Sequence, residues 1–130
     1  MDALIKAGII VDPGQLEVRV TEKGDTPLIN TARNGDTRAV VLLLQAKADV
    51  DARNNGGATA IFLASQNNHG ESLKALLGAK GDVNLATKGQ ASPCFIASQK
   101  GNANILRVLI ESKADVNYAK VQTSPMLVVA

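Results

Sequence analysis

Apolar positions recur along this chain in a pattern that repeats every 33 residues. One stripe of residues at helical spacing returns three times, as Ala39, Val40, Leu43 and Leu44, then as Ser72, Leu73, Leu76 and Leu77, and then as Ile105, Leu106, Leu109 and Ile110. Each stripe predicts a helix that is buried on one side. A period of this length is typical of a stacked array, because each unit is too small to bury its apolar side without its neighbours.

Short motifs mark the beginning and the end of each unit. The beginnings are Thr26-Pro27-Leu28, Thr59-Ala60-Ile61 and Ser92-Pro93-Cys94, and the ends are Ala48-Asp49-Val50-Asp51, Gly81-Asp82-Val83-Asn84 and Ala114-Asp115-Val116-Asn117. Thr26 can cap a first helix that has Pro27 at its first position and ends near Gly35. Turn residues such as Asn54-Asn55-Gly56-Gly57 favour a tight hairpin between units.

These motifs resemble those of the ankyrin repeat family, whose unit has this period and opens with Thr-Pro-Leu-His-x-Ala. The resemblance implies an all-α repeat solenoid, an ankyrin-type helix-turn-helix stack with short β-hairpin loops, as a single domain over 1–130. By register, three full repeats are flanked by two partial ones. The expected bounds are a partial repeat at 1–12, a hairpin finger at 9–21, repeats at about 22–54, 55–87 and 88–120, and a partial repeat at 121–130.

The chain departs from the family pattern in its loops. The His of the opening motif is replaced by Ile29, Phe62 and Phe95, and the Gly that follows the second helix is replaced by Lys47, Lys80 and Lys113. We expect these lysines to adopt a left-handed conformation, whose cost the helix dipole partly offsets. The first hairpin is longer than the others. Its alternation of Leu16, Val18 and Val20 with Glu17, Arg19 and Thr21 predicts a two-faced strand.

The composition argues against several classes of partner. A net charge of +2 gives no strong attraction to nucleic acid, and two Phe, one Tyr and no Trp leave few rings for base stacking. No stretch approaches the roughly 18 apolar residues of a membrane span, and the first residues lack a signal-peptide pattern. The lone Cys94 fits a reducing compartment. We therefore expect no nucleic-acid or membrane partner, and a cytoplasmic or nuclear location.

The residue types that could carry catalysis favour structural roles instead. His69 stands in the turn between two helices, and Cys94 occupies the apolar position of Leu28 and Ile61. Asp49, Asp82 and Asp115 recur with the repeat and so belong to separate layers, where they stabilise loops. The sequence has no metal-ligand cluster, phosphate-binding glycine loop or nucleophile elbow. We therefore expect no enzymatic activity and no cofactor.

The family resemblance implies binding of other proteins by the concave face of the stack, formed by hairpin tips and by the ends of first helices. Carried over by register, the expected partner-binding residues are Glu22, Lys23, Asp25, Arg33, Asn34, Arg53, Asn55, Gln66, Asn67, Lys88, Gln90, Gln99 and Lys100. This face is polar and mildly basic, which favours a folded domain or an acidic peptide as the partner. The lysines at 47, 80 and 113 are a second candidate surface.

Two alternatives to a simple binding module stay open. The chain could be a regulatory segment of a larger enzyme or channel, since a partial repeat at each end would expose apolar residues such as Met126 and Leu127. It could also associate with itself through those uncapped ends, although a monomer is favoured.

Overall fold

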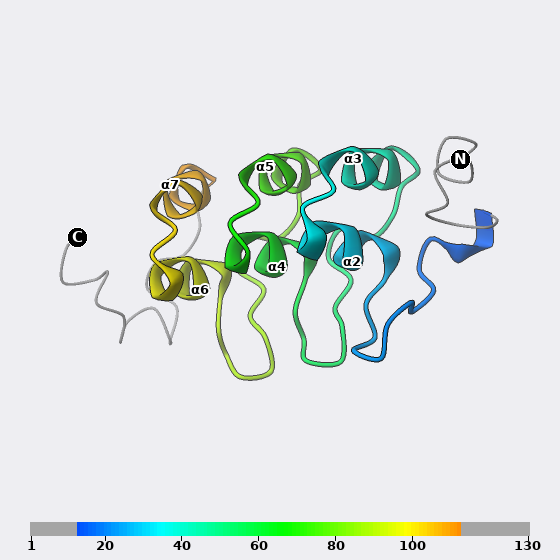
Figure 1. The fold of residues 1–130 in the computed structure, drawn as a ribbon, viewed down its shortest axis with the longest axis horizontal. Helices are drawn as coiled ribbons and strands as arrows, with labels where there is room; N and C mark the ends of the chain where they lie inside the picture. Colours follow the sequence, from blue (N-terminus) through cyan, green and yellow to red (C-terminus); the bar gives the residue numbers. More distant parts are fainter. Residues whose placement is uncertain (1–12, 113–130) are drawn as a thin grey trace.

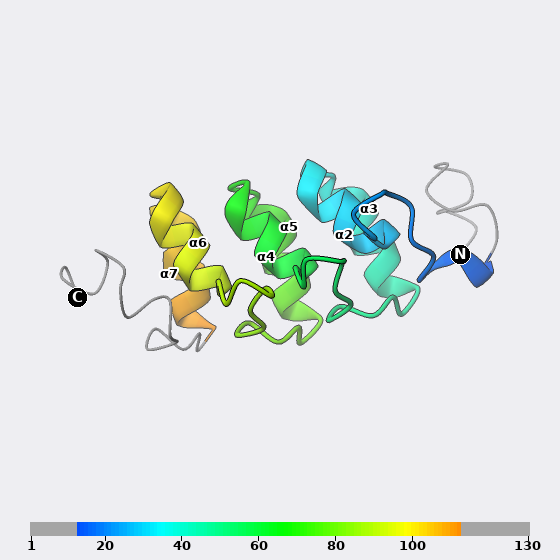
Figure 2. The same cartoon turned by 90° about the horizontal axis from the view of Figure 1, so that it is seen from below.

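The computed structural model describes residues 13–112, which form two rows of antiparallel helices (Figure 1). The elements in this range are η1 (Pro13–Gln15), α2 (Pro27–Asn34), α3 (Thr37–Gln45), α4 (Ala60–Gln66), α5 (Gly70–Gly78), α6 (Pro93–Lys100) and α7 (Ala103–Glu111). The first helices α2, α4 and α6 lie side by side, and the second helices α3, α5 and α7 form the other row (Figure 2). Long loops extend from the first-helix side (Figure 1).

Each first helix begins at a side-chain cap, as the sequence predicted. The hydroxyls of Thr26, Thr59 and Ser92 accept hydrogen bonds from the backbone N–H three residues later, over 3.3, 3.1 and 3.1 Å. These bonds satisfy amides that have no partner within a helical turn. The predicted helix end at Gly35 is confirmed by its φ of 75°, and Gly101 ends α6 in the same way with φ of 72°. In the middle repeat, the position equivalent to Gly35 is Asn68, which adopts the left-handed conformation with φ of 62°.

The apolar stripes meet in one core that runs through all three helix pairs. Its fully buried side chains include Leu28, Val40, Leu43, Ile61, Leu73, Leu76, Ile105 and Leu109. Cys94 is buried at the position of Leu28 and Ile61, as predicted. Lys47 and Lys80 have φ of 71° and 65°, which confirms their left-handed conformation. Lys113, Asp115 and the two partial repeats at 1–12 and 121–130 lie outside the described residues.

The residue before each second helix differs in what it binds. The Asp36 carboxylate caps its own helix by accepting a bond from the N–H of Ala39 over 3.2 Å. The His69 ring instead reaches the preceding repeat, where Nε2 lies 3.0 Å from the carbonyl oxygen of Arg33. Asn102 does the same in the next layer, because its Nδ2 donates to the carbonyl of Ser65 over 3.0 Å. The structural role predicted for His69 is therefore confirmed.

The predicted two-faced strand in the first hairpin is wrong. Within residues 13–112 no β-strand is present, and the segment after η1 is an irregular extended stretch. Its polar side chains face the neighbouring loop, since the Glu17 carboxylate accepts from the N–H of Asp49 over 2.9 Å and the Arg19 guanidinium donates to the carbonyl of Arg53 over 2.9 Å. Val18 and Val20 consequently point outward and are 45% and 47% exposed.

We predict that Leu76→Ala lowers the free energy of unfolding by about 2 to 5 kcal/mol, because Leu76 is fully buried and its truncation leaves a cavity. Chemical denaturation of the purified chain measures this change. Lys74→Ala on the same helix is the control, since Lys74 is exposed and its replacement should change stability by less than about 0.5 kcal/mol. Equal stability of Leu76→Ala and wild type would contradict the packing described above.

Candidate protein-interaction surface

The hairpin tips and the C-terminal ends of the first helices line one side of the stack, which Figure 2 views from the tips. Most of the partner-binding residues expected from the sequence are exposed there. On the tips these are Glu22, Lys23, Arg53, Asn55, Lys88 and Gln90, and on the helix ends Asn34, Asn67, Gln99 and Lys100. Gln66 and Arg33 are half-buried. The structure thus brings most of the predicted set to one side of the molecule.

Backbone hydrogen bonds join each tip to the next. The N–H of Asn55 donates to the carbonyl of Lys23 over 2.8 Å, and one layer on, the N–H of Lys88 donates to the carbonyl of Gly56 over 2.9 Å. The Asn55 side chain adds a bond to the carbonyl of Glu22 over 3.2 Å. The tips are therefore held at a fixed spacing from one another. A partner that spans several tips meets a surface that is already ordered, which lowers the entropy cost of binding.

Two arginines fasten successive hairpins to each other. Arg53 donates from Nε to the carbonyl of Gly57 in its own hairpin over 3.1 Å, and from Nη2 to the carbonyl of Ala86 in the next. Arg19 makes the same pair of bonds one layer earlier, to Gly24 over 3.1 Å and to Arg53 over 2.9 Å. The repeat pattern did not predict this link, because the two arginines are separated by 34 positions and not by the repeat length of 33.

The prediction that Asp25 contacts a partner is wrong, because Asp25 is fully buried. Its carboxylate accepts hydrogen bonds from Thr21 Oγ1 over 2.8 Å and from Asn54 Nδ2 over 2.9 Å. The Arg33 guanidinium forms an ion pair with it through Nη1 and donates from Nη2 over 3.2 Å. Arg33 is held by this cluster as well, so both residues stabilise the first hairpin. Asp25 is thus lost as a partner contact, and Arg33 and Arg53 both hold the hairpins in place.

The ion pair is particular to the first hairpin. In the two later repeats, the places of Asp25 and Arg33 are taken by Ala58 with Gln66 and by Ala91 with Gln99. A simpler hairpin closure is shared by all three layers, in which a side-chain oxygen accepts from the backbone N–H four residues later. Its pairs are Thr21 with Asp25 over 3.2 Å, Asn54 with Ala58 over 2.9 Å and Thr87 with Ala91 over 3.2 Å. The ion pair of the first hairpin is thus an addition to a hydrogen bond that closes all three hairpins.

The pKa of the Asp25 carboxyl reflects two opposing effects. Burial raises this pKa, because a charged carboxylate loses its hydration. The hydrogen bonds from Arg33, Asn54 and Thr21, together with the positive charge of Arg33, lower it and prevail. The pKa of Asp25 therefore lies below its ordinary value, and the carboxylate stays charged in the folded protein at neutral pH.

The loops that follow the second helices contain carboxylates that bind backbone N–H groups. Asp49 and Asp82 each accept a hydrogen bond from the backbone two residues later, over 3.0 Å in both cases. Asp51 links the layers, because its carboxylate accepts from the N–H of Asp82 over 2.8 Å. This confirms the loop-stabilising role predicted for Asp49 and Asp82. Among residues 13–112, no group of three or more His, Cys, Asp or Glu side chains could hold a metal ion.

We predict that acid weakens the wild-type fold partly through Asp25. Because its pKa is lower when folded than the unfolded value of about 3.9, the stabilising contribution is fully present above that value. It is lost as the pH falls through the folded pKa. Urea unfolding between about pH 7 and pH 2.5 should show a steeper loss of unfolding free energy for wild type than for Asp25→Asn. Parallel curves would contradict the charged cluster.

The other repeats supply a matched control for this ion pair. Asp25→Ala alone should cost about 1 to 3 kcal/mol, because Arg33 loses its partner at a partly buried site. Asp25→Ala with Arg33→Gln copies the Ala58 and Gln66 pair of the second repeat, and it should recover part of that loss. A double variant that is less stable than the single variant by the full cost of Arg33→Gln would show that the two residues act independently.

Comparison with known proteins agrees with this architecture. The family model described as ankyrin repeats (3 copies) matches residues 2–87, about two thirds of the chain. The helix pair α6 and α7 continues the same arrangement beyond the matched region. No curated protein matches the chain significantly. Within the described residues, no helix is long and apolar enough to cross a membrane. Ankyrin repeats are generally protein–protein interaction modules and are typically non-catalytic. By sequence and by fold, the chain belongs to the ankyrin repeat family.

Proposed function

We propose that this chain is a non-catalytic binding module whose partner, another protein, contacts the hairpin tips and the ends of the first helices. The observation that carries this proposal is the backbone linkage of neighbouring tips, Asn55 to Lys23 and Lys88 to Gly56. The linkage holds one ordered row of outward-pointing polar side chains along three layers. Such a preformed surface suits a scaffold or a regulatory protein, because it binds a partner at a low entropy cost and requires no reactive group.

The charges on this surface favour an acidic partner. Lys23, Lys88 and Lys100 are exposed, and Glu22 is the exposed carboxylate among the predicted contact residues. Asp25 and Arg33 neutralise each other inside the first hairpin, so they contribute little to the outer field. The surface that a partner meets is therefore mildly basic and rich in amide groups, which suits an acidic peptide or an acidic patch of a folded domain.

The second candidate function is self-association, which the outward-facing Val18 and Val20 favour. Exposed apolar residues on one edge of the stack can bind an apolar surface of a second copy. A light-scattering series from micromolar to millimolar concentration tests this, and a constant monomer mass would exclude it.

A monomer in the cytoplasm or the nucleus remains the state that we propose, where the single buried Cys94 stays reduced. A regulatory role inside a larger enzyme or channel stays a prediction.

We predict that Lys23→Glu, Lys88→Glu and Lys100→Glu together weaken partner binding by about 10- to 100-fold, because three rim charges become repulsive toward an acidic surface. Affinity capture from the source cells identifies the proteins that wild type retains, and calorimetry with the purified partner measures the change. Arg33 and Arg53 are left intact, because their replacement would disturb the hairpins themselves.

The matched control is Arg38→Glu, Lys47→Glu and Lys80→Glu, which changes the net charge equally at exposed positions on and after the second helices. It should leave the affinity within about twofold of wild type. If this control loses binding and the first variant binds fully, the binding site lies instead on the row of lysines that includes Lys47 and Lys80. Equal affinities of all three proteins would contradict both surfaces.

A further inference from the structure

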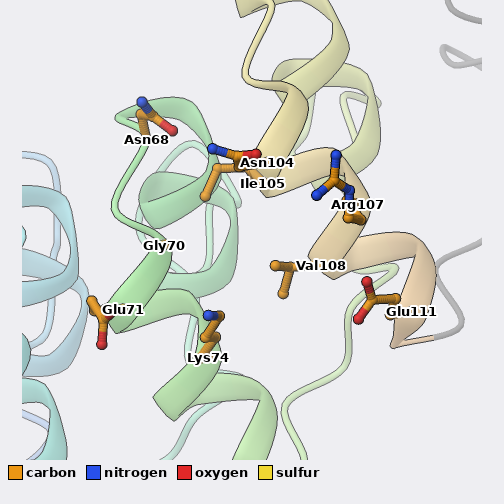
Figure 3. Close-up of a pocket in the computed structure, with 9 residues that line it drawn as sticks. All are labelled: Asn68, Gly70, Glu71, Lys74, Asn104, Ile105, Arg107, Val108 and Glu111. Atoms are coloured by element: carbon orange, nitrogen blue, oxygen red, sulfur yellow. The ribbon is translucent and has the colours of Figure 1, made fainter.

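A hollow of about 540 Å³ lies between α5 and α7, on the second-helix side of the stack (Figure 3). Its lining shares no residue with the hairpin tips, so it is independent of the binding surface proposed above. Its volume falls within the range of about 300 to 1,000 Å³ that is usual for ligand pockets. It therefore has room for a side chain of a partner together with its neighbouring residues.

Two differences between the repeats remove a hydrogen bond at the hollow. In the preceding layer, Thr37 Oγ1 hydrogen-bonds Ser72 Oγ over 2.9 Å and ties α3 to α5. One repeat later, these places are held by Gly70 and Ile105. Gly70 has no side chain and Ile105 has no hydroxyl, so this tie is lost between α5 and α7. A Cβ at Gly70 would lie 3.7 Å from Ile105 Cδ1, an ordinary contact, so a Cβ atom fits there without strain.

The lining of the hollow combines an apolar floor with two cations. Ile105 is fully buried and Val108 is half-buried, and both line the hollow from α7. Lys74 lines the hollow from α5 and Arg107 lines it from α7, so the two basic groups belong to different helices (Figure 3). Both cations are exposed. A carboxylate on an aliphatic stem matches this combination, because the stem can lie on the floor while the charge lies between the cations.

Neither of the two cations forms an ion pair within the described part of the chain. Over residues 13–112 the one ion pair is that of Arg33 with Asp25, so neither Lys74 nor Arg107 has a carboxylate within 4.0 Å there. Glu71 points away from Val108, and Glu111 lies at the far end of the hollow from Asn104 (Figure 3). The carboxylates on the same helices thus leave both basic groups available to an incoming anion.

We propose that this hollow is a second protein-binding site, which takes a glutamate side chain of a partner segment. Lys74 and Arg107 bind its carboxylate, and Ile105 and Val108 contact its methylene groups. Glu71 and Glu111 also line the hollow without pairing with the cations, so the formal charges of its lining sum to zero. That balance favours one carboxylate placed between the cations over a phosphate group or a polyanion, whose greater charge would be repelled by Glu111.

The test is a nuclear magnetic resonance titration of the isotope-labelled chain with two blocked tripeptides, acetyl-Leu-Glu-Leu-amide and acetyl-Leu-Gln-Leu-amide. The glutamate peptide should give saturable shifts of the amides of Gly70, Ile105 and Val108. The glutamine peptide should bind at least about fivefold more weakly, because it cannot pair with the cations. Equal binding of the two peptides, or shifts only at other residues, would overturn the proposal. Inorganic phosphate is the third probe, and binding as tight as that of the glutamate peptide would also overturn it.

Three variants locate the binding in the hollow. Lys74→Gln and Arg107→Gln should each weaken the glutamate peptide by about 3- to 10-fold, as expected for one exposed charge contact. Gly70→Thr copies the residue of the first layer and should weaken the shifts by narrowing the hollow beside Ile105, with the melting temperature unchanged or raised. Lys80→Gln is the matched control outside the hollow. Unchanged affinity in Lys74→Gln and Arg107→Gln, or the same loss in Lys80→Gln, would contradict the assignment.

Discussion

Burial of apolar side chains between consecutive repeats is the constraint on which the rest of this structure depends. Leu28, Ile61 and Cys94 hold the same position in three layers, and all three are buried. A single helix pair cannot cover these side chains, so each repeat is stable only against its neighbour. The strict 33-residue register of the core also places successive hairpins side by side. The backbone bonds between hairpin tips are therefore a consequence of core packing and not of strand pairing.

The features that the sequence predicted are those that depend on local chemistry. A hydroxyl at Thr26 before Pro27, a glycine at position 35 and the periodic apolar stripes locate the helices without knowledge of the tertiary structure. The features that it did not predict depend on groups far away in the chain. The alternation of apolar and polar residues between 16 and 21 separated two sets of side chains. Which set faces inward is decided by the carbonyl of Arg53 and the N–H of Asp49, which bind Arg19 and Glu17.

The candidate surface shows why register alone cannot separate structural residues from contact residues. Arg53 and Lys88 both stand on hairpin tips and both carry a positive charge. The planar guanidinium of Arg53 presents several N–H groups in fixed directions, so it can bond two carbonyls at once, in its own hairpin and in the next. The ammonium of Lys88 has no such geometry. Similar residues at similar places therefore divide between holding the stack together and facing a partner.

The two sides of the stack differ in how uniformly they are tied. On the hairpin side, the links recur from layer to layer, through Arg19 and then Arg53 and through successive tips. On the second-helix side, the link of Thr37 to Ser72 has no counterpart between Gly70 and Ile105, and the repeats open there into a hollow. Since the buried core is continuous through both layers, loss of that one hydrogen bond leaves the fold intact. A repeat protein can thus vary one face while the common core and the opposite face keep the register.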